Sequence, residues 1–345
     1  MAQRSGMHIG LVGAGRIGTM HARVLAGLPG VGRLTVADAA SKLARRVAVE
    51  VGAESAPGVE ELLDGGIDAL VIASSTGSHP GLIMAGADRG LPVFCEKPVA
   101  ADPASSQGVL DALAANGSSG GRATVMIGHQ RRFDRGYLEA RRALQAGDLG
   151  WVHSLRAMTC DQSPPLVAYL ASSGGLFRDC SVHDFDILRW LTGREIVEVY
   201  ARGSNRGDPE IGRIGDVDTA VALCTLDDGT LATVAATRYN GAGHDVRLEV
   251  QGSRASIAVG LDDSSALRSA EPGVAFPSGH PHASFMQRFA QAYRDEMAAF
   301  VDLAAGRGEN RCTPEEAVAA SVVADAAHAS LETGVAVQVG AAAVR

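Results

Sequence analysis

Short apolar runs alternate with longer amphipathic stretches over roughly the first 130 residues. Strands that alternate with helices at this spacing are typical of βαβ units, which place their strands side by side in one parallel sheet. This part of the chain therefore predicts a doubly wound nucleotide-binding domain. The predicted strands are residues 7–13, 34–37, 68–73, 92–95 and 123–127, and the predicted helices are residues 17–28, 41–51, 59–63, 80–89 and 103–115.

The pattern changes after about residue 130, where strand-like runs follow one another without helices between them. Ala220–Leu226 and Leu231–Thr237 are joined by Asp-Asp-Gly-Thr, which predicts a hairpin. A second hairpin is predicted from residues 246–250 and 255–259, and a late helix should begin at Thr313-Pro314, where a capping residue precedes proline. The other predicted elements are helices at 135–146 and 174–191 and a strand at 151–157.

These patterns predict an α/β protein of two domains, as the length of 345 residues also favours. Residues 1–130 form the N-terminal Rossmann domain, with a doubly wound parallel sheet. Residues 131–345 form a C-terminal α+β domain with an open, largely antiparallel sheet.

Charge and cysteine usage narrow the class of protein. The formal net charge of −8 argues against binding to nucleic acid, which requires a basic face. The five cysteines are odd in number and form no Cys-x-x-Cys pair, which favours free thiols in a reducing compartment. The segment before Met7 is short and polar, and no apolar run approaches about 18 residues, so we expect a cytoplasmic protein with no membrane segment.

The first chemical motif is the turn Gly-Ala-Gly-Arg-Ile-Gly between the first strand and the first helix. Gly13 allows the tight turn, Gly15 lets a pyrophosphate approach the backbone, and Gly18 lets the helix pack closely on the sheet. Arg16 and Ile17 belong to the same turn, which we expect to contact a dinucleotide.

Asp38 ends the second predicted strand, twenty residues beyond the turn. A carboxylate there accepts hydrogen bonds from a ribose diol and repels a 2′-phosphate, so NAD is favoured over NADP. Asp38 could instead be an ordinary turn residue, and Arg45 and Arg46 on the next helix could weaken the exclusion of NADP.

Two further motifs carry candidate catalytic residues. Glu96-Lys97-Pro98 follows a buried strand, at the edge where open α/β sheets bind ligands, although it could be only a polar loop. Asp179 and His183 lie four residues apart on a predicted helix, so the carboxylate can orient the imidazole as a general base. A capped helix start or a structural pair remains open. We expect no metal site, because the acidic residues near His183 do not share one helical face and no second histidine cluster exists.

In this order and spacing, three segments resemble the Gfo/Idh/MocA oxidoreductase family. They are GAGRIG at 13–18, EKP at 96–98 and GGLFRDCSVHDFD at 174–186. The resemblance covers nearly the whole chain, including GHQRRFDRGY at 128–137, and within the family it is greatest to the myo-inositol 2-dehydrogenases. It implies that the second domain binds substrate and forms dimer or tetramer contacts.

The resemblance implies NAD-dependent oxidation of a secondary hydroxyl of a cyclitol, sugar or polyol. His183 would take the hydroxyl proton and Asp179 would orient it. Lys97 would hydrogen-bond the reacting oxygen while the nicotinamide accepts the hydride. It also implies cofactor contacts in the loops that follow the later strands of the first domain. These would come from Ser74, Ser75, His79, Glu96, Lys97 and Arg131. His79 could equally be a helix-start residue and Arg131 a salt bridge that links the domains.

Two segments differ from the inositol enzymes where substrate contacts are expected. Asp161 lies in the first of these, Thr159–Pro164, and His244 in the second, Ala242–Asp245, and we place both residues at the substrate site. The particular hydroxyl compound is left open. Alternatives are a non-catalytic NAD-binding sensor or regulator on the same fold, an NADP-linked ketosugar reductase, and a sugar oxidoreductase that recycles a tightly bound cofactor.

Overall fold

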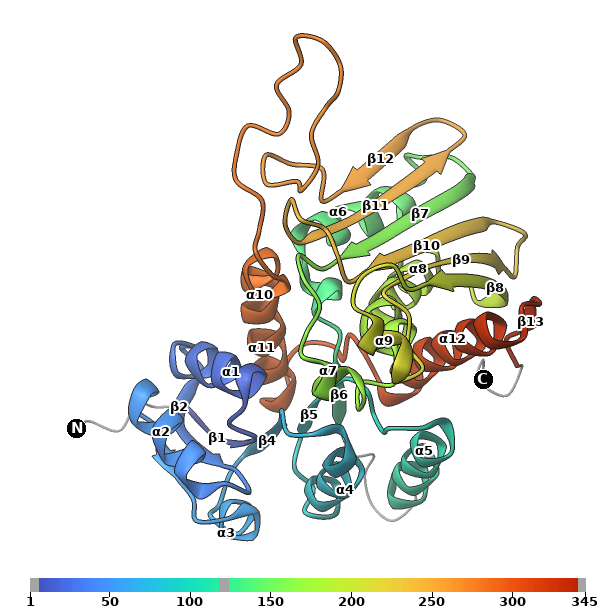
Figure 1. The fold of residues 1–345 in the computed structure, drawn as a ribbon. Helices are drawn as coiled ribbons and strands as arrows, with labels where there is room; N and C mark the ends of the chain where they lie inside the picture. Colours follow the sequence, from blue (N-terminus) through green and yellow to red (C-terminus); the bar gives the residue numbers. More distant parts are fainter. Residues whose placement is uncertain (1–5, 118–123, 341–345) are drawn as a thin grey trace. The chain divides into compact units, whose positions relative to one another are not determined.

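The computed structural model describes residues 6–117 and 124–340, which fold into two compact units (Figure 1). Unit 1 runs to Gln130 and also contains Gln291–Val318, and unit 2 consists of Arg131–Ala290 and the residues from Ala319 onward. Unit 1 thus includes a late segment that the sequence prediction assigns to the second domain. Residue 123, the start of one predicted strand, lies outside the described residues.

Unit 1 is built on a six-stranded sheet with the order β3-β2-β1-β4-β5-β6, in which all paired strands are parallel. The strands are β1 Met7–Val12, β2 Val31–Ala37, β3 Glu54–Ser55, β4 Ala69–Ile72, β5 Val93–Glu96 and β6 Val125–Gly128. The helices are α1 Arg16–Ala26, α2 Ser41–Val51, α3 Val59–Leu63, α4 His79–Asp88, α5 Pro103–Gly117 and α11 Ala290–Ala304.

The strand order creates a switch point between β1 and β4. From there the chain moves outward to β2 on one side and to β5 on the other, so right-handed crossovers place their helices on opposite faces of the sheet. The loops that leave β1 and β4 therefore diverge at the carboxyl edge, where doubly wound sheets bind ligands. The predicted Rossmann domain is confirmed.

Helix α11 belongs to unit 1 because its apolar side packs there. Phe300 lies against Phe94 of β5 with ring centroids 5.7 Å apart, and Tyr293 meets His21 of α1 edge-on at 5.9 Å. These contacts join residues more than 200 positions apart in the chain, and no local pattern in the sequence indicates which sheet the helix covers.

Glu296 is a fully buried acid on α11. Burial raises the pKa of its carboxyl well above the ordinary value and neighbouring Glu96 raises it further, whereas the backbone N–H of His129 lowers it. Because the folded protein holds this proton at pH values where the unfolded chain has lost it, Glu296 reduces stability as pH rises.

We expect Glu296→Gln to be more stable than the wild type, by a margin that grows between about pH 5 and about pH 8. The amide mimics the neutral acid and does not titrate. The measurement is denaturant unfolding at both pH values, with the exposed Glu309→Gln as control. An equal difference at the two pH values would show that Glu296 is charged in the folded protein.

Unit 2 is built on a seven-stranded sheet with the order β12-β11-β7-β10-β9-β8-β13. Its neighbouring strands are antiparallel except for β7 and β10, which are parallel. The strands are β7 Val152–Cys160, β8 Ile196–Ser204, β9 Thr219–Leu226, β10 Leu231–Thr237, β11 Asp245–Gly252, β12 Ser256–Val259 and β13 Val337–Gln338. The helices are α6 Arg135–Gln145, α7 Val167–Leu170, α8 Val182–Thr192, α9 Pro209–Arg213, α10 Phe285–Arg288 and, from Ala319 onward, α12 Pro314–Thr333.

The predicted open, largely antiparallel sheet and both predicted hairpins are confirmed. β9 and β10 pair as expected, and the amide of Leu226 donates to Thr230 O across the turn. β11 pairs with β12 in the same way. Helix α12 begins at the predicted proline, and the side chains of Thr313 and Glu316 cap each other's backbone N–H.

Helix α8 packs against β7 and β10 on one face of this sheet (Figure 1). Large apolar side chains remain exposed on the outward positions of the strands, among them Val221, Leu223 and Leu231. No disulfide joins the five cysteines, all of which are buried. Within the described ranges, no helix combines the length and the apolar character needed to cross a membrane.

Candidate active site

The glycine turn of unit 1 has the geometry that a dinucleotide requires. Gly13 has φ +105°, and a Cβ there would lie 2.5 Å from the carbonyl of Ala73. A Cβ on Gly18 would collide with the carbonyl oxygen of Gly13. At Gly15 a Cβ would meet nothing within 4 Å, so the space above the turn is open for a phosphate to reach the backbone. These residues fit a dinucleotide.

Asp38 follows β2, and both its carboxylate oxygens accept backbone hydrogen bonds. Oδ2 accepts from Ala14 N at 2.7 Å and Oδ1 from Ala40 N at 2.8 Å. Asp38 thus fastens the glycine turn to the end of the second strand, which is the turn role considered above. Each oxygen keeps a second lone pair, so the half-buried carboxylate can still accept from a ribose diol.

We expect Asp38→Ala to raise the KM for NAD⁺ by about tenfold and to relax discrimination against NADP⁺, since each lost charge-assisted hydrogen bond is worth about 1.5–3 kcal/mol. Initial rates with both coenzymes test this, with the exposed Asp111→Ala as control. An unchanged coenzyme preference would restrict Asp38 to its role in the turn.

The loop after β4 is tied to the loop after β5 by His79. Its ring is buried, with Nδ1 2.7 Å from Pro98 O and Nε2 3.3 Å from Ser74 O. Ser74 and Ser75 lie at the carboxyl edge beside the switch point, and Ser75 is exposed. His79 is also the first residue of α4, so the helix-start reading describes its position and the hydrogen bonds describe what its side chain does.

Glu96, the last residue of β5, contacts a buried imidazole. Its Oε1 lies 2.7 Å from Nε2 of His21, which is fully buried on α1. Lys97, the next residue, is half-buried at the carboxyl end of β5. On the first turn of α1, Arg16 is exposed and Ile17 is half-exposed. Glu96 therefore supports the loop that carries Lys97 from within unit 1.

In unit 2 the predicted helix over 174–191 has an irregular start. Gly174 and Gly175 have φ of +81° and +88°, and Phe177–Ser181 then form a π-helical turn that continues into α8. Asp179 lies on the π turn and His183 lies on the first turn of α8. Such π turns are frequent at functional sites because they redirect side chains within a helix.

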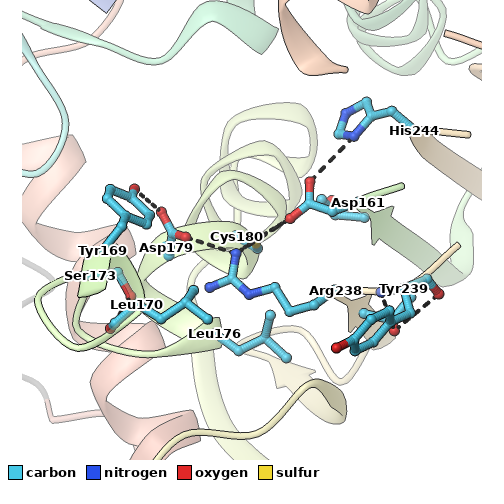
Figure 2. Close-up of polar contacts among 12 residues, drawn as sticks. Asp161, Tyr169, Leu170, Ser173, Leu176, Asp179, Cys180, Arg238, Tyr239 and His244 are labelled. Carbon is cyan, nitrogen blue, oxygen red and sulfur yellow. Dashed lines mark hydrogen bonds and ion pairs between the residues drawn. The ribbon is translucent and has the colours of Figure 1, made fainter. Parts of the chain in front are cut away.

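Two side chains hold the Asp179 carboxylate. The Tyr169 hydroxyl donates to Oδ1 at 2.9 Å, and Nη1 of Arg238 lies 2.8 Å from Oδ2 (Figure 2). Burial raises the pKa of Tyr169 and the charge of Asp179 raises it further, so the phenol stays protonated and remains a donor. Asp179 is thereby fixed in position within unit 2.

Arg238 links Asp179 to Asp161 and, through Asp161, to His244, the two residues that the sequence places at the substrate site. Its Nη1 also lies 3.4 Å from Oδ2 of Asp161, whose Oδ1 is 3.4 Å from Nδ1 of His244 (Figure 2). Burial lowers the pKa of the guanidinium, but Cys180, Asp179 and Asp161 beside it raise that pKa by more, so the cation is retained. Asp161, Asp179 and His244 thus belong to one polar cluster.

The sequence predicts those three residues but neither Arg238 nor Tyr169. A signal for Arg238 exists in the alternation of β10, where Ala232, Val234 and Ala236 point inward and residue 238 continues the buried series. A charged residue at an inward position indicates a buried ion pair. Tyr169 sits on the four-residue helix α7, and no local pattern distinguishes it.

Arg131 forms a buried ion pair inside unit 2. Its Nη1 lies 2.5 Å from Asp184, while its Nη2 donates to Thr159. Arg132 donates to both carboxylate oxygens of Asp186, through Nε and Nη2. Asp184 and Asp186, the acidic residues near His183, are therefore bound to arginines, and Arg131 fastens α8 to β7.

Comparison with known proteins agrees with this description. The model described as "Oxidoreductase family, NAD-binding Rossmann fold" matches residues 7–120, and that of the Gfo/Idh/MocA C-terminal domain matches residues 137–258. The chain is 39% identical over 301 residues to a myo-inositol dehydrogenase of Streptomyces leeuwenhoekii, covering 87% of this chain and 89% of that protein. It is 34% identical over 298 residues to an NAD⁺-linked scyllo-inositol 2-dehydrogenase of Bacillus subtilis, covering 85% and 84%.

Solved structures are similar over nearly the full length. A putative myo-inositol dehydrogenase from Sinorhizobium meliloti has a TM-score of 0.87 at 32% identity, covering 97% of this chain and 100% of that one. A scyllo-inositol dehydrogenase from Lactobacillus casei, solved with NAD(H) and scyllo-inositol, has a TM-score of 0.87 at 28% identity, covering 97% and 99%.

The glycine turn, the doubly wound sheet and these matches define an NAD-dependent dehydrogenase that acts on CH–OH groups. The chain belongs to the Gfo/Idh/MocA oxidoreductase family. The predicted class, family and cofactor are confirmed.

Proposed function

We propose that this protein oxidises a secondary hydroxyl of an inositol to the ketone, with NAD⁺ as the oxidant. The observation that carries this proposal is the polar cluster of unit 2. In this cluster the Asp179 carboxylate, held by Tyr169 and Arg238, precedes His183 by four residues. Asp161 and His244 supply further hydrogen-bonding groups to the same cluster. The relatives named as inositol dehydrogenases support the same substrate class.

The cluster suits a neutral polyhydroxyl substrate. Asp161 and Asp179 share one guanidinium, so these three groups together carry a negative charge. Carboxylate oxygens accept hydrogen bonds from hydroxyl groups, while a phosphate or carboxylate on the substrate would be repelled. We therefore expect cyclitols and neutral sugars to be preferred over sugar phosphates and sugar acids.

In the proposed reaction, His183 accepts the proton of the reacting hydroxyl. The negative charge of Asp179 favours the imidazolium that results. Lys97 donates a hydrogen bond to the reacting oxygen and stabilises the charge that develops on it. Bound NAD⁺ supplies the acceptor for the hydride that leaves the carbinol carbon. The products are a ketone, NADH and one proton.

A substrate panel tests the proposal. We expect NADH to form with one or more inositol isomers, to form more slowly with aldoses and linear polyols, and to be negligible with sugar phosphates. NADP⁺ is assayed in parallel. Failure of every polyol with both coenzymes would favour a non-catalytic NAD-binding regulator, and faster turnover with NADPH and a ketosugar would favour a reductase.

A further inference from the structure

We propose that Arg238 is a positioning residue of the active site, which holds Asp161 and Asp179 together through a single nitrogen. Arg238 would act through these carboxylates on the groups that contact the substrate. The catalytic part of this inference rests on the proposed function. The sequence motifs of the site do not include this residue.

The contacts of Arg238 are one-sided. Nη1 reaches Asp179 Oδ2 at 2.8 Å, Cys180 Sγ at 3.0 Å and Asp161 Oδ2 at 3.4 Å (Figure 2). Nε and Nη2 are buried and have no hydrogen-bond partner among residues 6–117 and 124–340. All the polar contacts of the guanidinium with the described residues are therefore made by Nη1, the nitrogen that faces the two carboxylates.

A role limited to filling the core does not explain this arrangement. The side chain is 1% exposed, and burying two nitrogens without partners costs free energy that an apolar side chain of similar length would avoid. What an apolar side chain cannot supply is a positive charge between two carboxylates. Without that charge Asp161 and Asp179, which both contact Nη1, are left as two neighbouring negative charges that repel each other.

The same cation connects the two halves of the cluster. On one side Asp179 is held by Tyr169 and precedes His183. On the other side Asp161 faces Nδ1 of His244. A shift of about 1 Å in groups that position a substrate can reduce the rate by about 10²-fold, so the alignment of both carboxylates by one residue affects turnover directly.

The first test is a double-mutant cycle on stability with Arg238→Met and Asp161→Asn. With Arg238 present, Asp161→Asn removes an attraction and should lower the melting temperature. In the Arg238→Met background, Asp161→Asn removes a repulsion and should raise the melting temperature. The two shifts should each be about 2 °C and opposite in direction. Equal shifts in the two backgrounds would overturn the proposal. If Arg238→Met does not fold, Arg238→Lys takes its place. Lysine retains the charge, so Asp161→Asn must still destabilise, and a stabilising effect would overturn the proposal.

The second test measures catalysis. We expect Arg238→Met to lower kcat for the best inositol by about tenfold or more while the dissociation constant for NAD⁺ stays within about twofold. The double variant should have a higher kcat than Arg238→Met alone, and Arg238→Lys should retain part of the activity. Unchanged kcat in Arg238→Met would overturn the proposal. If the wild type oxidises no inositol, the proposed function fails, and the stability cycle alone decides the role of Arg238.

Discussion

His183→Ala is expected to lower kcat for inositol oxidation by about 10²–10⁴-fold, the range associated with loss of a general base. His183 lies on α8 of unit 2, whereas the glycine turn and Asp38 lie in unit 1. The dissociation constant for NAD⁺ should therefore remain within about twofold, and the loss should appear in kcat rather than in coenzyme binding. Steady-state rates and a separate NAD⁺ titration measure the two effects.

His153→Ala is the matched control for this variant. His153 is exposed on β7 and stacks edge-on with Trp151 at 4.0 Å between ring centroids, outside the polar cluster. The kcat of the His153→Ala variant should equal that of the wild type. Turnover of His183→Ala within about threefold of the wild type would remove His183 from the proton transfer.

Lys97→Ala is expected to lower kcat by about 10²–10³-fold, because it removes a charged donor from the oxygen on which negative charge develops. Lys97→Arg should recover only part of the loss, since the planar guanidinium places its donors differently from an ammonium group. Rates at saturating inositol and NAD⁺ test both variants.

The chain offers an unusually direct control for Lys97, since Lys42 is its one other lysine. Lys42 is exposed on α2, and Lys42→Ala should retain full activity. A kcat for Lys97→Ala close to that of Lys42→Ala would contradict the role proposed for Lys97.

Most of the fold can be predicted because the signals are local. The alternation of apolar strands and helices in unit 1 and the Asp-Asp-Gly-Thr turn between β9 and β10 each act within a few residues. β3 and β13 span two residues each, which is too short to show a period. The placement of α11 in unit 1 depends on contacts between Phe300 and Phe94, and distant contacts of this kind leave no local trace.

In the candidate site, too, the features that can be predicted are those with a local signal in the sequence. Gly13 is predictable because its positive φ favours glycine, and Gly18 because a Cβ there would collide with the Gly13 carbonyl oxygen. The spacing of Asp179 and His183 is visible in the sequence, but the π turn under Asp179 and its bonds to Tyr169 and Arg238 are not. Those partners come from α7 and from the end of β10, and only the tertiary fold brings them together.

In the proposed reaction, hydride passes from a ring carbon of an inositol to NAD⁺. To test this, the wild-type protein is incubated with NAD⁺ and an inositol deuterated at its ring carbons. The molecular mass of the NADH is then measured by mass spectrometry. We expect one deuterium in the NADH that forms and a slower rate than with unlabelled inositol. NADH that carries no deuterium, or no NADH with any inositol isomer, would contradict the proposed reaction.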